Sequence, residues 1–155
     1  MMRNVLTTLA LAAMLTAMPG TGLAKDKKGD VLAAWIGAWT TGPEQNITIL
    51  RGTGGMLSIE GFASWGASDP DRVASGGVNV GEFYADVPAG WIEDTRLAFG
   101  VGADGTIRPD AAEQFDCVVQ LEIGYTQLLA TDNGMCGGHN VRFDGTYHRA
   151  GKQAN

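Results

Sequence analysis

The chain has 155 residues, 23 of them glycine, and a formal net charge of −6 at pH 7. This length suits one domain with a substantial core, and the many short apolar runs separated by glycines favour an all-β domain. The acidic charge and the lack of a basic cluster argue against binding to nucleic acid or to anionic membranes, and they permit a basic partner.

Residues 1–24 have the features of a bacterial secretory signal peptide. Arg3 provides the positive charge, residues 5–17 are apolar, and Gly22-Leu23-Ala24 offers small residues for cleavage. A transmembrane anchor is the competing interpretation, but the apolar run is short for a span. No cysteine follows the cleavage site, so we expect no lipid anchor. The sequence therefore predicts a periplasmic or secreted protein, with a charge of −7 and no membrane anchor after cleavage.

The rest of the chain is expected to comprise a charged, mobile leader (25–34), a single β-barrel domain (35–149) and a tail (150–155). Alternating or β-branched residues bounded by turn residues predict short strands. In chain order, the predicted strands lie at residues 35–41, 47–49, 57–61, 78–83, 97–101, 117–123, 127–131 and 141–149, with a short return at 106–107. We expect residues 64–94 to be the least regular part, with Gly81 forming a bulge or bend.

The stretch from Cys117 to Arg149 predicts three strands in series. Apolar and polar residues alternate along 117–123 and again along 141–149, which is typical of half-buried antiparallel strands. Asp132-Asn133-Gly134 is a strong turn signal, because Asn and Gly tolerate positive φ.

Both cysteines of the chain, Cys117 and Cys136, lie in this stretch. A hairpin after residue 123 brings Cys117 close to residue 131, and the glycine-rich loop around Cys136 can fold back towards it. A Cys117–Cys136 disulfide is therefore geometrically plausible, and by chain entropy it would contribute about 3 kcal/mol. An oxidising compartment favours the disulfide. Two free buried thiols are the alternative.

About eight short antiparallel strands in sequence order suggest a meander that closes into a small barrel, which removes exposed sheet edges. A two-layer β-sandwich is the alternative. The alternation predicts which side chains point inward: Leu57, Ile59, Leu97, Phe99, Val119, Leu121, Val141, Phe143 and Tyr147.

The first strand carries Gly37-Ala38-Trp39, a Gly-x-Trp that resembles the opening motif of lipocalin-like barrels. That resemblance implies that Trp39 plugs one end of the barrel under a basic residue from the last strand, a position that Arg149 suits. An ordinary core tryptophan is the alternative.

The C-terminal segment resembles the ending of a group of small bacterial exported proteins, some of which are related to lysozyme inhibitors. The shared-looking elements are Asp132-Asn133-Gly134, Cys136-Gly137-Gly138, Asn140-Val141 and Gly145-Thr146-Tyr147. They cover about a fifth of the chain and consist of a turn, a cysteine loop and a closing strand. The resemblance therefore implies a fold and a periplasmic location more than an activity.

Catalytic and metal-binding patterns are lacking in the sequence. His139 and His148 have no cysteine or acidic pair at metal-ligand spacing, and no serine stands in a Gly-x-Ser-x-Gly context. We therefore expect a protein that is not an enzyme and that uses no metal or cofactor.

Four aromatic residues suggest a binding surface: Trp65, Phe83, Tyr84 and Trp91 cluster with acidic residues in the irregular stretch. The alternative is that they cap the core under a long loop. Two functions follow as hypotheses. One is a periplasmic binding protein for a protein partner, such as a basic cell-wall hydrolase; the other is a lipocalin-like carrier of a small apolar ligand.

Overall fold

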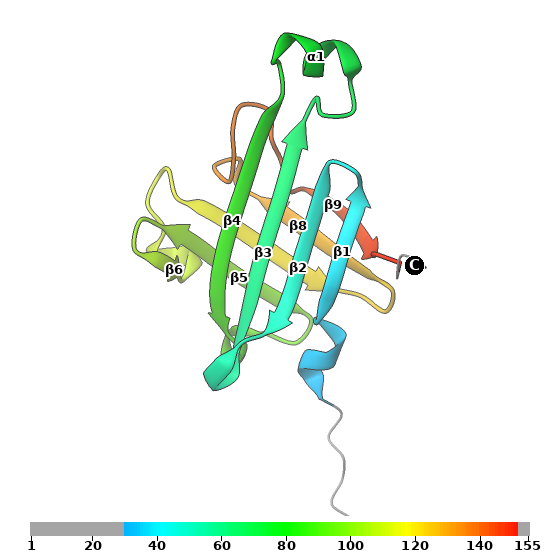
Figure 1. The fold of residues 1–155 in the computed structure, drawn as a ribbon. Coiled ribbons are helices and arrows are strands. Elements are labelled where there is room, and N and C mark those ends of the chain that lie inside the picture. Colours follow the sequence, from blue (N-terminus) through cyan, green and yellow to red (C-terminus); the bar gives the residue numbers. More distant parts are fainter. Residues whose placement is uncertain (1–29, 152–155) are drawn as a thin grey trace, which may run out of the picture.

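The computed structural model describes residues 30–151, so the predicted signal peptide, residues 25–29 of the predicted leader and residues 152–155 lie outside it. Nine antiparallel strands form a nearly closed barrel (Figure 1). The strands are β1 (Gly37–Gly42), β2 (Gln45–Arg51), β3 (Met56–Trp65), β4 (Asn79–Pro88), β5 (Arg96–Gly102), β6 (Gly105–Ile107), β7 (Cys117–Ile123), β8 (Gln127–Asp132) and β9 (Gly145–Arg149).

Helical structure in the described part is short. It comprises the α-helix α1 (Pro70–Ser75) and four 3-10 turns, η1 (Val31–Ala34), η2 (Thr53–Gly55), η3 (Ala89–Trp91) and η4 (Pro109–Ala111). Between residues 30 and 151, no helix has the length and hydrophobicity needed to cross a membrane. The prediction of an all-β antiparallel barrel is confirmed.

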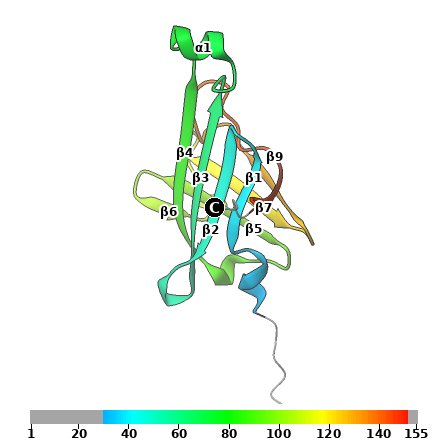
Figure 2. The same ribbon diagram turned by 45° about the vertical axis from the view of Figure 1, so that its right-hand side comes forward.

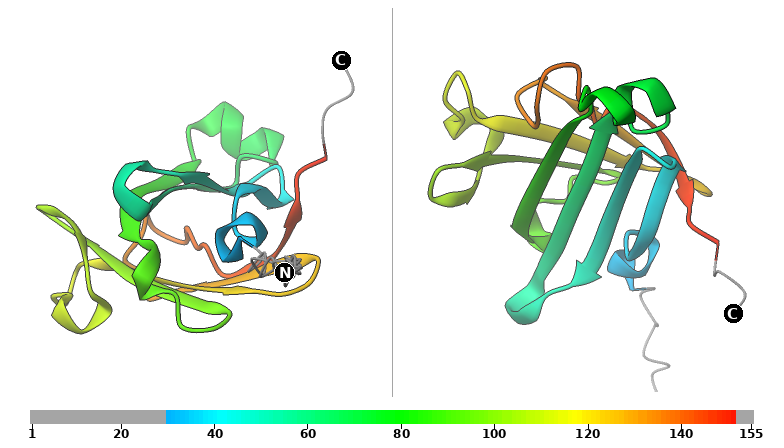
Figure 3. Two further views of the ribbon diagram at one scale, coloured as in Figure 1. Left: turned by 90° about the horizontal axis from the view of Figure 1, so that it is seen from below. Right: turned by 45° about the horizontal axis from the view of Figure 1, so that its top comes forward.

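The strand order around the barrel is β4-β3-β2-β1-β9-β8-β7-β5-β6. The first and last strands pair, so β9 joins the two halves of the sheet on one side (Figures 2 and 3). The order departs from a simple meander at one place. Instead of pairing with β4, β5 pairs with β7 on one edge and β6 on the other. The sheet is therefore not closed by strand pairing between β4 and the β5–β6 hairpin.

The interior holds the apolar face of every long strand. All nine side chains that the alternation predicted to point inward are at most 3% exposed, so this prediction is confirmed. They belong to one continuous core that also includes Trp35, Trp39, Ile47, Ile49 and Phe83.

Residues 64–94 are more regular than the sequence suggested. β4 is a ten-residue strand that pairs with β3 along its whole length without a register shift, so Gly81 forms no bulge. The glycine at position 81 has another cause: a Cβ there would lie 2.6 Å from the Cα of Gly137 and 2.9 Å from the carbonyl oxygen of Cys136. The disulfide loop thus packs directly on the start of β4, which leaves no room for a side chain.

Part of the predicted mobile leader belongs to the folded domain. Asp30 caps η1, since its carboxylate accepts a hydrogen bond from the amide of Leu32 (3.2 Å). Leu32 packs against the core, and the carbonyl of Ala34 accepts a hydrogen bond from Arg149 (2.7 Å). Residues 31–34 are therefore anchored at one end of the barrel, and their assignment to a mobile leader is wrong.

The predicted disulfide between Cys117 and Cys136 is present. It ties the loop between β8 and β9 to the start of β7. Asn133 adds to this link, because its side chain accepts a hydrogen bond from the amide of Val118 (3.1 Å) and donates one to the carbonyl of Asp116 (2.8 Å). The last strand is shorter than predicted, because it begins at Gly145 instead of residue 141.

Candidate functional site

Trp39 and Arg149 close one end of the barrel, at the positions that the Gly-x-Trp motif suggests. The guanidinium carbon of Arg149 lies 4.2 Å from the centre of the Trp39 ring, and the arginine donates hydrogen bonds to the carbonyls of Ile36 (2.8 Å) and Ala34. Gly37 has a φ of +149°, and a Cβ there would lie 2.5 Å from the Arg149 guanidinium. The glycine is therefore needed for the arginine to cover the tryptophan.

The inside of the barrel is filled by side chains. Trp35, Trp39, Phe99, Phe143 and Tyr147 are each at most 1% exposed. Such low exposure leaves no water-sized space beside these side chains, as expected for a small barrel whose interior is just wide enough to be packed. A binding site is therefore to be sought on the outside.

The four aromatic residues predicted to form a binding surface do not lie together. Phe83 is 3% exposed and packs inside against Phe99 and Phe143, with ring centres 5.8 and 4.8 Å apart. Its assignment to a surface is wrong, because it occupies an inward position of the regular strand β4. Tyr84, the next residue, points outward and is 61% exposed.

The two tryptophans are partly buried, each beneath an arginine. The guanidinium of Arg72 lies 4.0 Å from the ring centre of Trp65, at the end of β3. The guanidinium of Arg108 lies 4.3 Å from the ring centre of Trp91, in η3. These cation–π contacts cover one face of each ring, so of the four predicted aromatics only Tyr84 presents a largely open side chain.

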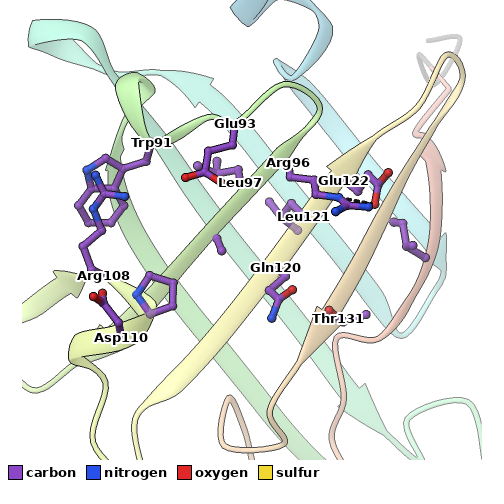
Figure 4. Close-up of a pocket in the computed structure, with 13 residues that line it drawn as sticks. Trp91, Glu93, Arg96, Leu97, Arg108, Asp110, Gln120, Leu121, Glu122 and Thr131 are labelled. Atoms are coloured by element: carbon purple, nitrogen blue, oxygen red, sulfur yellow. Dashed lines mark hydrogen bonds and ion pairs between the residues drawn. The ribbon is translucent and has the colours of Figure 1, made fainter.

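One groove of about 640 Å³ runs over the outer face of β5, β7 and β8. Figure 4 shows Trp91 stacked with Arg108 at one end and the ion pair of Arg96 with Glu122 (3.1 Å) towards the other. Gln120 lies between these two pairs (Figure 4). Both arginines of the groove therefore already have partners within the chain, and residues 30–151 supply the groove with no unpaired cationic group.

A second surface, here called the acidic face, consists of Glu60, Glu82, Tyr84 and Asp86 on the outside of β3 and β4. In the strand register Glu60 lies opposite Tyr84, while Glu82 and Asp86 flank the tyrosine along β4. All four residues are exposed. Beside them, a groove of about 510 Å³ separates β3 and β4 from Gly105 and Thr106 of β6.

The charge of the acidic face is not neutralised within the described residues. Residues 30–151 contain sixteen acidic residues, six arginines and no lysine, a formal charge of −10. Each arginine is engaged elsewhere, either with a carboxylate or over a tryptophan. No ion pair in residues 30–151 involves the three carboxylates of the acidic face. The face is therefore complementary to a positively charged partner.

Polar groups near the last strand stabilise the fold. Asp132 and Asn133 organise the loop before β9, and Tyr147 donates a hydrogen bond to the carbonyl of Phe143 (2.9 Å). Burial, with a smaller contribution from nearby carboxylates, raises the pKa of Tyr147. His139 and His148 are both exposed. Between residues 30 and 151, no three His, Cys, Asp or Glu side chains are grouped as a metal site would require.

The acidic face could have been found from the sequence. Residues 80–86 alternate polar or exposed residues with buried ones, and Glu82, Tyr84 and Asp86 fall on the same side. Gly81 obscured this pattern, because glycine inside a strand suggests a bulge. The place of Glu60 beside Tyr84 depends on the register of β3 with β4, which the local pattern does not contain.

Compared with known proteins, the chain matches no protein-family model, no curated protein and no solved structure. The candidate site therefore rests on its own geometry.

Proposed function

We propose that this chain is an exported, non-enzymatic binding protein of the bacterial periplasm that binds a positively charged protein through the acidic face. The observation that carries the proposal is the grouping, around one exposed tyrosine on the outside of β3 and β4, of three carboxylates that form no ion pair within residues 30–151. Aromatic residues at the centre of a protein interface contribute much of its binding energy, while surrounding charges guide association and select the partner.

A basic cell-wall hydrolase is the partner class that we favour. Such an enzyme works in the compartment that the N-terminal segment and the disulfide favour, and its charge is opposite to that of the acidic face. The likeness of the C-terminal segment to small exported proteins, some related to lysozyme inhibitors, points in the same direction.

The filled interior argues against a lipocalin-like carrier. A ligand inside a barrel needs an open lumen, but Phe99, Phe143 and Tyr147 occupy the middle of this one. A small apolar ligand would need either a rearranged core or a site on the outside.

A pull-down from periplasmic extract tests the proposal when it compares three forms of the mature protein. The first is the wild type, and the second is a face variant in which the acidic face loses its charge. The third is a matched control that loses the same charge elsewhere. The face variant is E60Q/E82Q/D86N, and the control is D94N/D110N/E113Q, whose acids also lack ion pairs within residues 30–151.

The wild type and the control should retain the same basic protein, and the face variant should release it. Loss from both variants alike would mean that net charge, not this face, drives capture, and would contradict the proposal. Native mass spectrometry of the purified protein should show the mass of the chain alone. A retained apolar molecule would favour the carrier instead.

A further inference from the structure

The backbone of β4 faces the open side of the barrel at every second residue. The amide of Asp86 donates a hydrogen bond to the Oγ1 of Thr106 in β6 (3.0 Å). The carbonyl of Val80 accepts one from the amide of Gly138 in the disulfide loop (3.2 Å). Neither partner belongs to β3, so at these two positions the backbone polar groups point away from the sheet.

The same direction follows for the two residues between them. In an antiparallel pair, the backbone groups of successive residues point alternately towards and away from the neighbouring strand. The β3–β4 ladder has no register shift, so Glu82 and Tyr84 have the orientation of Val80 and Asp86. Their two N–H and two C=O groups therefore point sideways from the edge of the sheet, away from β3.

These four backbone groups have no partner within residues 30–151. β4 ends the strand order, and no backbone hydrogen bond among the described residues joins it to β5 or β6. Thr106 closes one end of this edge, while Gly138 and Gly137 close the other at Val80 and Gly81, which leaves the four residues 82–85 open. At about 3.3 Å per residue, the open edge is roughly 13 Å long.

We propose that the open edge of β4 accepts an extended, positively charged segment of a partner protein as an additional antiparallel strand. Free N–H and C=O groups in a row are a template for such strand addition. The proposal specifies how the acidic face engages its partner, and it rests on the proposed function for the charge of that partner.

The side chains of β4 define the sequence that the added strand should have. Glu82, Tyr84 and Asp86 point outward, so every second residue of the added strand faces them and should be lysine or arginine. The intervening residues face the side of Phe83 and Ala85, which are buried, and should be small and apolar. Alternation of basic and apolar residues is therefore the expected signature.

A second copy of this chain is a poor occupant. Two β4 edges paired with each other would bring Glu82 and Asp86 of both copies together, and like charges opposite each other destabilise a sheet. The acidic side chains thus protect the edge against self-association, but they attract a cationic strand.

The edge can be tested residue by residue through amide exchange measured by NMR on the disulfide-bonded mature protein. In the free protein, the amides of Glu82 and Tyr84 should exchange faster than those of Phe83 and Ala85, which point towards β3. Addition of a capped heptapeptide that alternates four lysines with three valines should slow exchange at Glu82 and Tyr84.

N-methylated peptides separate strand addition from charge attraction. Glu82 and Tyr84 point their backbone groups towards the added strand, so the residues directly opposite them point their own backbone groups towards β4. These opposite residues are lysines, because directly opposite side chains lie on the same face of a sheet. The lysine amides therefore face β4. Methylation of the lysine amides should weaken binding at least about tenfold, while methylation of the valine amides should not. The charge is the same in all three peptides.

Equal binding by the three peptides would overturn strand addition. So would slow exchange of Glu82 and Tyr84 in the free monomer, or a dimer that protects these amides without peptide. The two proposals fail separately. If the protein captures a basic protein through the acidic face without protection of these amides, the proposed function stands and strand addition is refuted. If the protein captures no basic protein, the proposed function is refuted, while the exchange pattern still tests whether the edge of β4 is open.

Discussion

The contact between Gly61 and Phe83 offers a test of the packed interior. The two residues are neighbours across β3 and β4, and the Phe83 ring lies over the Cα of the glycine. A Cβ at Gly61 would lie 2.1 Å from Cε1 and 2.4 Å from Cζ of the ring, far inside the ordinary contact distance of about 3.5–4 Å. The ring cannot easily withdraw, because Phe99 and Phe143 pack against it.

These distances define a double-mutant cycle. Gly61→Ala should cost about 1–3 kcal/mol of unfolding free energy through overpacking, and Phe83→Ala about 3–5 kcal/mol through the cavity it leaves. In the Phe83→Ala background the added methyl group meets no ring. Gly61→Ala should then be neutral, or stabilising by about 0.4–1 kcal/mol, because alanine restricts the unfolded chain. The coupling between the two sites should therefore exceed about 1 kcal/mol.

Urea denaturation of the disulfide-bonded protein measures each unfolding free energy. Gly90→Ala is the matched control, because a Cβ at Gly90 meets no atom within 4 Å. Its cost should be small and the same in both backgrounds. If Gly61→Ala costs the same with and without the Phe83 ring, or if Phe83→Ala costs less than about 1 kcal/mol, the packed interior described here is wrong.

Three further predictions concern the ends and links of the barrel. Arg149→Ala should lower the unfolding free energy by about 1–3 kcal/mol, measured by urea denaturation, because it removes two hydrogen bonds and a cation–π contact; Arg149→Lys should recover only part of the loss. Reduction of the Cys117–Cys136 disulfide should increase the intact mass by two hydrogen atoms and should cost about 3 kcal/mol of unfolding free energy for a sequence separation of 19 residues. Free thiols in the native exported protein would contradict the presence of this disulfide. The pKa of Tyr147 is raised in the folded state, so the folded protein holds the phenol proton more tightly than the unfolded chain does. The stability that this provides is complete below the unfolded pKa of about 10. It is lost as the pH rises towards the folded pKa, by about 1.4 kcal/mol per pH unit. Tyr147→Phe should remove this part of the alkaline loss in melts between pH 9 and 12, whereas the exposed Tyr125→Phe should retain it.

Local patterns in the sequence predicted much of the barrel. Apolar side chains recur at every second position of residues 97–101 and 117–123, and the structure buries the four that were predicted to point inward, Leu97, Phe99, Val119 and Leu121. The disulfide followed from the hairpin and the glycine loop. The role of Trp39 and Arg149 followed from a three-residue motif, which works here because Gly37 leaves space for the guanidinium.

Contacts between distant segments account for what the sequence did not predict. The pairing of β5 with β7 instead of β4 is a choice among similar strands, and nothing within either strand specifies it. Gly81 was misread because its neighbour, Gly137, lies far along the chain. Because Gly81 interrupts the alternation of β4, the sequence predicts an exposed Phe83 and hides both the acidic face and its open edge.

We propose above all that this protein binds a cationic partner through the acidic face. A calorimetric titration with a basic lysozyme, at low and at physiological salt, tests the claim most directly. The wild type and D94N/D110N/E113Q should bind with similar affinity, and binding should weaken as salt screens the charges. The E60Q/E82Q/D86N variant should lose binding while its melting temperature stays unchanged. Binding that survives in this variant, or that both variants lose to the same extent, would contradict the account.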